Sequence, residues 1–486
     1  MTHDHAKMPT ARRLPLSLAL LPVLALFGAI GLAMATIGTG GDALLLSILF
    51  AAAVAGIVAR HAGAGWSAVQ AETARQIAEA FPAILILLSI GALIGSWMFS
   101  GTIPLLVVLG IDLIDPHYMA LTAFVATALM SLISGTSWGS AGTIGVALMG
   151  AAAAMQIPLA PIAGAVVSGA YLGDKLSPLS DMTNISAIGA GAELYAHIRH
   201  MVWTSLPPAL IALAVFAAMG LAGGTASGAA AADTALIRGE LGSAFRLGPI
   251  EALPLLVALV GIAARRPPAL VIMASAVLAL AIGVLHQGFA PAQAMASFVN
   301  GFDTGTVMPG RTFAPTITNL LDRGGLASMA GTLLFIFAAF LLAGGMAVSG
   351  ALERLLEALL QMVGSVASLI AATMAAGAIM VAMTSHGGVT ALVVGGLFRK
   401  PYAERDLAPE NLSRTIEDSV TVTEPLMPWT VSAVFMASTL GVSTLAYAPW
   451  AIFCWLSPLA SLVVALSFRP SPKGPVRYAK RGAGAA

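Results

Sequence analysis

Residues 169–181 read Gly-Ala-Tyr-Leu-Gly-Asp-Lys-Leu-Ser-Pro-Leu-Ser-Asp. Asp174 in this segment is the first charged residue after a stretch, residues 116–173, that has no Asp, Glu, Lys or Arg. Similar charge-free stretches run from residue 358 through 398 and from 425 through 468. The chain of 486 residues is 58% hydrophobic and only 9% charged, whereas an average soluble domain has about 25% charged residues. Lipid must therefore surround much of the chain, which predicts an all-α polytopic membrane protein.

A helix needs about 20 mostly apolar residues to cross a bilayer. Several candidate runs are shorter or contain Gly and Pro, so we expect broken helices and re-entrant hairpins among them. Residues 66–80, with Glu72, Arg75 and Glu79, predict an amphipathic helix at the membrane interface. The candidate spans are residues 14–35, 43–58, 81–99, 104–114, 117–133, 201–221, 253–263, 268–285, 325–348, 363–383 and 447–468.

The chain divides into two apolar halves and three more polar segments. The predicted transmembrane halves cover residues 14–222 and 252–468, and a Gly-, Ala- and Ser-rich linker joins them at residues 223–251. The tails at residues 1–13 and 469–486 contain Lys and Arg, which mark the cytoplasmic side of a membrane. We therefore expect both termini in the cytoplasm and an even number of crossings.

Both halves contain the same order of features. In the first half, a Gly/Ser/Thr-rich break at residues 134–143 is followed by an apolar run and then by Asp174 and Asp181. In the second half, a break at residues 384–390 is followed by an apolar run and then by Glu417, Asp418 and Glu424. Thr136 precedes Asp174 by 38 positions (174 − 136), and Thr384 precedes Asp418 by 34 (418 − 384). This order predicts two structural repeats whose broken helices meet near the bilayer midplane.

These residue types suit a site where a proton and a sodium ion compete. A sodium ion entering a dry site must replace its water shell with oxygen ligands, which carboxylates, hydroxyls and carbonyls at a helix break supply. An unpaired carboxylate in lipid costs several kcal/mol, so it must be protonated, paired or bound to a cation. One carboxylate can thus hold a proton or a sodium ion in turn. The candidates are Thr136, Ser137, Asp174, Ser180, Asp181, His386, Asp418 and Glu424.

Structural roles for the same residues stay open at this point. Asp174 could pair with Lys175, and Asp181 could cap a helix. Glu417 is expected to pair with Arg414. His386 could titrate near neutral pH and gate transport, or serve as a hydrogen-bonded structural residue. Glu424 could cap a helix, and Thr136 and Ser137 could serve helix packing.

These segments resemble the NhaC-type sodium/proton antiporter family. The resemblance spans about residue 80 to the last helix. It is carried by residues 90–104, 135–145 and 168–181 in the first half and by residues 411–418 and 440–449 in the second. The second half departs from the family pattern at Glu424, at Thr430 and in the break around His386.

The resemblance implies an inner-membrane exchanger related to the ion-transporter superfamily, with inverted repeats and an elevator-like movement. It places Asp174, Ser177 and Asp181 in the ion site, with Asp418 and Thr421 as their second-half partners. Asp174, Asp181 and Asp418 become the predicted Na⁺ ligands, and Asp174 is the first candidate for the residue that alternates between proton and sodium. Some relatives exchange organic acids or other metabolites.

The sequence thus predicts a secondary active transporter that exchanges Na⁺ for H⁺ across a bacterial cytoplasmic membrane by alternating access. The alternative is a sodium- or proton-coupled exchanger of a small organic acid or other metabolite. The expected partners are the lipid bilayer and the ions Na⁺ and H⁺, with a homodimer left open. No cofactor is expected, and the net charge of +1 gives no basic field for nucleic acid.

The main rival from another class is an intramembrane aspartyl protease, in which two aspartates share a proton. Leu172-Gly173-Asp174 faintly resembles one of its motifs, but no matching Tyr-Asp partner occurs. A nucleotide-binding loop of the Gly-x-x-x-x-Gly-Lys-Ser/Thr kind is also absent from the sequence, which argues against ATP-driven pumping. We therefore expect a transporter and not an enzyme.

Overall fold

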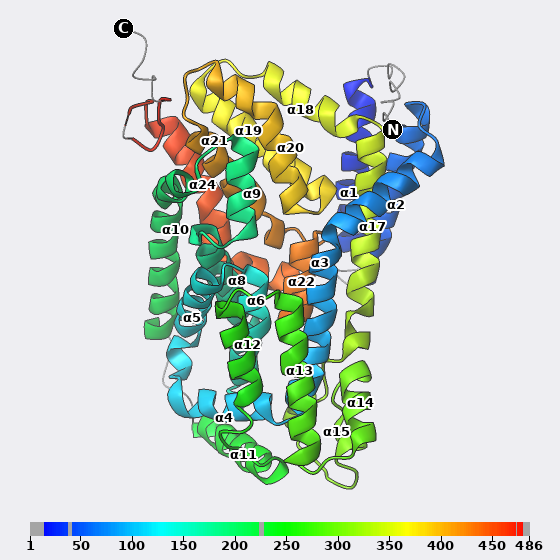
Figure 1. Ribbon diagram of the computed structural model, residues 1–486, viewed down its shortest axis with the longest axis vertical. Helices are drawn as coiled ribbons and strands as arrows, with labels where there is room; N and C mark the ends of the chain where they lie inside the picture. Colours follow the sequence, from blue (N-terminus) through cyan, green and yellow to red (C-terminus); the bar gives the residue numbers. More distant parts are fainter. Residues whose placement is uncertain (1–13, 37–40, 223–227, 473, 480–486) are drawn as a thin grey trace, which may run out of the picture.

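The structure is a computed structural model that describes residues 14–36, 41–222, 228–472 and 474–479. Within these residues the chain is a bundle of helices (Figure 1), and eight of the helices are long and apolar enough to cross a membrane. A ninth span results if the bent pair Val431–Leu440 and Thr444–Trp450 counts as one. The prediction of an all-α polytopic membrane protein is confirmed. The basic residues Lys7, Arg12, Arg13, Lys473, Lys480 and Arg481 lie outside the described residues, so the orientation of the termini stays a prediction.

The helices of the first half are α1 (Leu16–Thr36), α2 (Gly41–His61), α3 (Trp66–Phe99), α4 (Thr102–Leu113), α5 (Met119–Ser134), α6 (Ser137–Ser140), α7 (Val146–Ala154), α8 (Leu159–Leu176), α9 (Asp181–Ala190) and α10 (Leu194–Ala222). A π-helical turn, η2 (Ala141–Gly145), joins α6 to α7. Helix α11 (Gly228–Ala244) lies within the predicted linker.

The helices of the second half are α12 (Leu253–Ala263), α13 (Pro268–Leu285), α14 (Pro291–Asn300), α15 (Thr304–Val307), α16 (Pro315–Leu321), α17 (Ala330–Val348), α18 (Ala351–Gln361), α19 (Val366–Thr384), α20 (Gly387–Ala403), α21 (Pro409–Ile416), α22 (Val431–Leu440), α23 (Thr444–Tyr447) and α24 (Ile452–Ser467). The π-helical turn η4 (Glu417–Thr421) continues α21.

Helix α3 differs from its prediction. Residues 66–99 form one helix of 34 residues, whereas a separate interfacial helix was expected at residues 66–80. Pro82 lies inside α3 without ending it, since neighbouring helices can accommodate a proline in a membrane bundle. The charged residues of this segment pair with each other, because the Arg75 Nε atom donates to Glu72 Oε2 at 2.9 Å. The amphipathic segment is therefore the first part of a longer helix.

The two halves contain matching helix breaks 250 residues apart. Helix α5 is followed by Gly135 in the left-handed region (φ 70°, ψ 27°) and then by extended Thr136 (φ −146°, ψ 119°). Helix α19 is followed by Ser385 (φ 58°, ψ 11°) and then by extended His386 (φ −140°, ψ 117°). The offset is the same for both pairs, since 385 − 135 and 386 − 136 both give 250. A left-handed residue followed by an extended one turns the chain sharply out of each helix.

The same offset relates α9 to α22. Each helix has 10 residues, begins after a hydroxyl N-cap and ends at a left-handed glycine. The caps are Ser180 and Thr430, and the glycines are Gly191 and Gly441, so 430 − 180 and 441 − 191 again give 250. The predicted organisation of two repeats with broken helices therefore agrees with the backbone of these segments.

This register corrects one prediction about the repeat. The counterpart of Asp174 is Glu424 and not Asp418, because 424 − 174 also equals 250. Thr136 follows the first break, whereas Thr384 is the last residue of α19 and precedes the second break. The predicted alignment therefore began two positions out of register and ended on the wrong acid.

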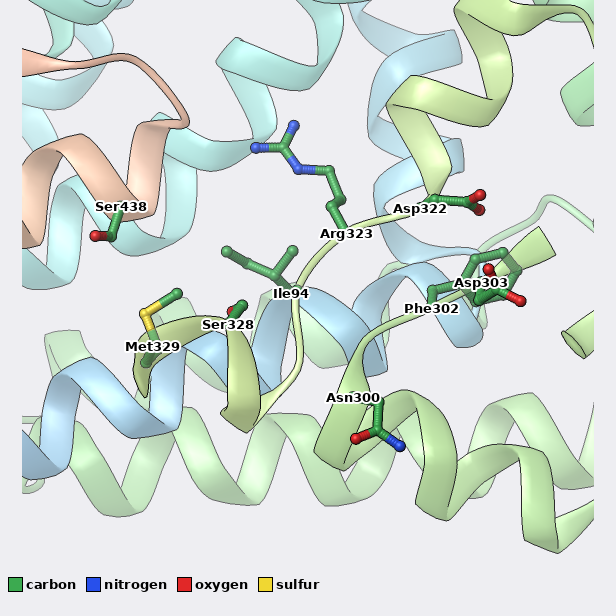
Figure 2. Close-up of a pocket in the computed structure, with 10 residues that line it drawn as sticks. Ile94, Asn300, Phe302, Asp303, Asp322, Arg323, Ser328, Met329 and Ser438 are labelled. Atoms are coloured by element: carbon green, nitrogen blue, oxygen red, sulfur yellow. The ribbon is translucent and has the colours of Figure 1, made fainter. Parts of the chain in front are cut away.

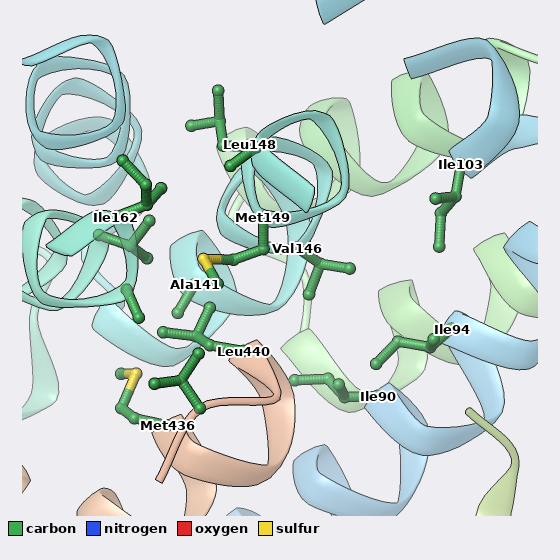
Figure 3. Close-up of a cluster of buried hydrophobic side chains, with 14 of the residues drawn as sticks. Ile90, Ile94, Ile103, Ala141, Val146, Leu148, Met149, Ile162, Met436 and Leu440 are labelled. Atoms are coloured by element: carbon green, nitrogen blue, oxygen red, sulfur yellow. The ribbon is translucent and has the colours of Figure 1, made fainter. Parts of the chain in front are cut away.

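The second repeat packs into the core of the first. The cluster in Figure 3 joins Ile90 of α3 and Met149 of α7 to Met436 and Leu440 of α22. The stacked rings of Trp138 and Phe435, with centroids 4.0 Å apart, add a further contact between the halves. Helix α22 is therefore fixed by first-half residues on one side and begins at the site described below.

Helices α9 and α20 approach so closely that glycine is needed between them. A Cβ atom on Gly395 would lie 2.5 Å from the backbone of Gly189, whereas one on Gly396 would meet nothing within 4 Å. We expect Gly395→Ala to lower the stability of the protein by roughly 1–3 kcal/mol, because overpacking displaces both backbones. The neighbouring Gly396→Ala should be neutral or slightly stabilising. Melting of the two detergent-purified variants checks this, and equal melting temperatures would contradict it.

Candidate ion and substrate site

The four repeat-related helix breaks meet at one cavity of about 560 Å³. The breaks after α5 and α19 line the cavity with residues 135–137 and 386–388. The breaks before α9 and α22 line it with residues 179–181 and 431–432. Both repeat-related acids, Asp174 and Glu424, also face this cavity. The predicted site residues that line it are Thr136, Ser137, Asp174, Ser180, Asp181, His386, Thr421 and Glu424.

Asp174 is held in the last turn of α8, where its side chain is 5% exposed. The Ser137 hydroxyl donates to Asp174 Oδ2 at 2.9 Å, so the first helix break supplies a direct partner for the acid. Lys175, the next residue along α8, pairs elsewhere, which leaves Asp174 without a cationic partner. Asp174 therefore presents to the cavity a buried carboxylate that has the Ser137 and Ser180 hydroxyls beside it.

Glu424 occupies the equivalent place in the second repeat and is 6% exposed. A Cβ atom on Gly387 would lie 2.6 Å from Glu424 Oε2, so glycine lets the carboxylate approach the start of α20. Gly387 is the repeat counterpart of Ser137, since 387 − 137 equals 250. The two repeats thus place a carboxylate beside the first residue after a helix break in each half.

Three buried polar atoms at the cavity make no hydrogen bond of ordinary geometry to a described residue, although Ser432 lies beside the Tyr171 hydroxyl and Glu417 beside the Thr421 hydroxyl. They are the Tyr171 hydroxyl, His386 Nδ1 and the Thr421 hydroxyl. Buried polar atoms are nearly always satisfied in native proteins by protein groups, water or ligands. These atoms therefore fit a cavity that binds water, an ion or a polar solute. Sequence reasoning missed Tyr171.

Asp418 does not line this cavity, which corrects its predicted place among the Na⁺ ligands. It forms a fully buried ion pair with Lys175, and both side chains are 0% exposed. The Ser457 and Thr204 hydroxyls donate to the same Oδ1 atom at 3.0 and 3.1 Å. Because a lysine ammonium already neutralises Asp418, this carboxylate fits a structural role better than sodium binding.

The predicted pair of Glu417 with Arg414 is also corrected. Arg414 Nε lies 3.8 Å from Asp418 Oδ2, and neither carboxylate oxygen of Glu417 has a hydrogen-bond partner among the described residues. Side chains three and four residues apart can both pair on a helix, and in the structure Arg414 pairs with Asp418.

Ser177 has a structural role in the break after α8. Its hydroxyl donates to the Leu132 carbonyl at 2.8 Å and accepts from the Leu179 backbone N–H at 3.3 Å. Asp181 is exposed at the first position of α9 and faces the cavity, while Ser180 provides the helix cap. Within the described residues no group of three or more His, Cys, Asp or Glu side chains is arranged to hold a metal ion, so the predicted set Asp174, Asp181 and Asp418 does not come together.

A second cavity, of about 520 Å³, lies near the opposite end of α22. Figure 2 shows the Arg323 side chain extending away from Asp322 and Asp303. An Nη atom of Arg323 would lie 2.9 Å from a Cβ atom on Gly441, the residue that ends α22. The guanidinium therefore stands where it complements the negative end of the helix dipole. None of the predicted site residues lines this cavity.

A multi-span helical protein whose broken helices bring buried carboxylates to one cavity is a membrane transporter by class. The family model described as the Na⁺/H⁺ antiporter family matches residues 169–467. The chain belongs to this family.

Three relatives match most of the chain. The chain is 38% identical to an uncharacterized Na⁺/H⁺ antiporter of Haemophilus influenzae, over 96% of this chain and 98% of that protein. It is 34% identical to the Na⁺/H⁺ antiporter NhaC of Alkalihalophilus pseudofirmus, over 84% and 87% of the two chains. It is 31% identical to the malate-2H⁺/Na⁺-lactate antiporter of Bacillus subtilis, over 79% and 80%. The resemblance predicted from residues 90–104, 135–145, 168–181, 411–418 and 440–449 is therefore confirmed.

Proposed function

We propose that the protein is a secondary active transporter that exchanges Na⁺ for H⁺ across a bacterial cytoplasmic membrane. The observation that carries the proposal is the placement of Asp174 and Glu424 at repeat-related positions of one cavity. Family membership and the antiporter relatives support the same function. No enzymatic step and no cofactor enter the proposal, and both termini are assigned to the cytoplasm.

In the proposed cycle, Asp174 binds a proton when sodium is absent, because burial disfavours a free carboxylate. A sodium ion entering the cavity displaces this proton and takes oxygen ligands from Asp174, Ser137 and the neighbouring break. Alternating exposure of the cavity to the two sides of the membrane then couples the two ions. Asp418 stays paired with Lys175 throughout this cycle.

The rival protease function has a specific structural objection. A proteolytic dyad needs two aspartates that share a proton. Lys175 holds Asp418, while Asp174 faces the cavity beside Ser137. Asp174 and Asp418 therefore interact with different residues.

A sodium- or proton-coupled exchanger of a small organic acid is the second candidate. The volume of the cavity favours it, because about 560 Å³ exceeds what a dehydrated sodium ion needs. The name of the Bacillus subtilis relative, a malate-2H⁺/Na⁺-lactate antiporter, supports the same possibility.

Purified protein in liposomes tests the main proposal. Internal pH is followed while NaCl, LiCl or KCl is added outside acid-loaded vesicles. We expect Na⁺ to drive proton efflux from the vesicles while K⁺ does not. Proton movement that does not depend on Na⁺ would overturn the proposed exchange.

The repeat predicts a role for Glu424 as well. We expect Glu424→Gln to lower the apparent affinity for Na⁺ at least tenfold, because one of the two carboxylates of the cavity is lost. Glu424→Asp should retain more of the affinity, since the negative charge remains. A sodium titration of exchange at constant pH measures this. Equal affinities in the wild type and the glutamine variant would remove Glu424 from the ion site.

A further inference from the structure

Two arginines stand in the loop between α12 and α13 and line the same cavity as Asp174 and Glu424. They are Arg265 and Arg266, and both are exposed. Neither guanidinium makes a hydrogen bond or ion pair with any described residue. The lining of the cavity thus includes both carboxylates and two arginines that have no partner among the described residues.

The backbone at Arg265 is strained for a residue that is not glycine. Arg265 adopts a left-handed conformation with φ 59°. Its N–H donates to the Ile262 carbonyl at 2.9 Å, and the Arg266 N–H donates to the Gly261 carbonyl at 3.1 Å. When the residue after a helix C-terminus is left-handed, it is usually glycine, because glycine adopts this conformation without strain. A non-glycine residue here costs of order 1–3 kcal/mol, and such strain concentrates at functional sites.

The size of the cavity leaves room for a solute beside an ion. Pockets for small organic molecules measure about 300–1,000 Å³, and this one measures about 560 Å³. One water molecule has only about 30 Å³ of liquid volume. The cavity therefore has room for a sodium ion together with a small organic molecule.

We propose that Arg265 and Arg266 bind the carboxylate of a small organic anion that shares the cavity with the transported cation. Guanidinium groups match carboxylates through two parallel N–H···O bonds, which a single ammonium cannot reproduce. Asp174 and Glu424 repel the anion from their part of the wall, so its carboxylate turns toward the arginines. This inference rests on the proposed cation exchange at Asp174 and adds the class of solute.

Uptake of labelled small carboxylates by liposomes containing the full-length protein tests the inference. The probes are ¹⁴C-lactate and ¹⁴C-succinate, with unlabelled succinamide and inorganic phosphate as competitors. In the wild type we expect Na⁺-dependent uptake of at least one carboxylate, competition by the other and no competition by succinamide. Stronger competition by phosphate than by either carboxylate would assign the arginines to phosphate and overturn the proposal.

Variants separate a binding role from a structural one. We expect Arg265→Gln/Arg266→Gln to raise the KM for the carboxylate at least tenfold, and Arg265→Lys/Arg266→Lys to raise it less. The control Arg60→Gln removes an exposed arginine that does not line the cavity and should leave this KM unchanged. If glutamine and lysine variants both keep the wild-type KM, or if the wild type takes up no carboxylate while it exchanges Na⁺ for H⁺, the inference fails. Absence of Na⁺/H⁺ exchange in the wild type would instead contradict the proposed function.

Discussion

Asp174→Asn is expected to abolish sodium-dependent proton movement in liposomes, down to the background of empty vesicles. The amide has the shape of the carboxylate and can still accept the hydrogen bond from Ser137, but it has no negative charge and takes up no proton, so it cannot exchange one ion for the other. Because Asp174 lacks a cationic partner, its neutralisation should not destabilise the fold. Internal pH and ²²Na⁺ flux measure the loss, and melting of the purified variant monitors folding.

Asp42→Asn is a matched control for this experiment. Asp42 is an exposed aspartate in the first turn of α2 and does not line the cavity. We expect wild-type exchange from the control. Exchange by Asp174→Asn at the wild-type rate would remove Asp174 from the transport cycle and leave Glu424 as the principal acid.

Asp418→Asn is expected to damage folding more than any other single change considered. Removing one partner of a buried ion pair leaves an uncompensated charge and costs about 3–5 kcal/mol. Here the uncompensated charges are the Lys175 ammonium and the Arg414 guanidinium, which lies 3.8 Å from Asp418 Oδ2, and both side chains are 0% exposed. We expect a large loss of monodisperse protein and a lower melting temperature, whereas Asp174→Asn should melt like the wild type.

The double variant Lys175→Met/Asp418→Leu separates the loss of charge balance from the loss of the side chains. Apolar replacements of a buried pair are often neutral or stabilising, so we expect it to recover much of the stability lost in Asp418→Asn. The Ser457 and Thr204 hydroxyls would lose their acceptor, and the buried Arg414 guanidinium would lose the carboxylate 3.8 Å away, which limits the recovery. Wild-type melting of Asp418→Asn would show that Lys175 is neutralised in some other way.

The membrane fold could be predicted from the sequence because its long charge-free stretches must be surrounded by lipid. Helix breaks were also predictable, since Gly, Ser and Thr gather at Gly135 and Ser385. The correct register was available but missed. Asp174-x-Leu-x-Pro-x-Ser180 and Glu424-x-Leu-x-Pro-x-Thr430 share one pattern and differ in position by 250 residues.

Other parts of the site depend on contacts that no local pattern encodes. Lys175 and Asp418 are 243 positions apart, and only the packing of α8 against η4 brings them together. Arg265 and Arg266 lie in a loop outside the repeat-related breaks, so no shared pattern links them to the cavity. Tyr171 lies on α8 among apolar residues and resembles an ordinary core aromatic in the sequence.

The ion pair between Lys175 and Asp418 joins the two repeats, so it can form only after both have been synthesised. At about 5–20 residues per second, the ribosome needs roughly 10–50 s to reach Asp418 after it has made Lys175. During that time the Lys175 ammonium, in the last turn of α8, lacks the carboxylate that neutralises it in the folded protein. The burial of Lys175 is therefore completed only after the second repeat has emerged, so we expect a truncated first repeat to be unstable and degraded.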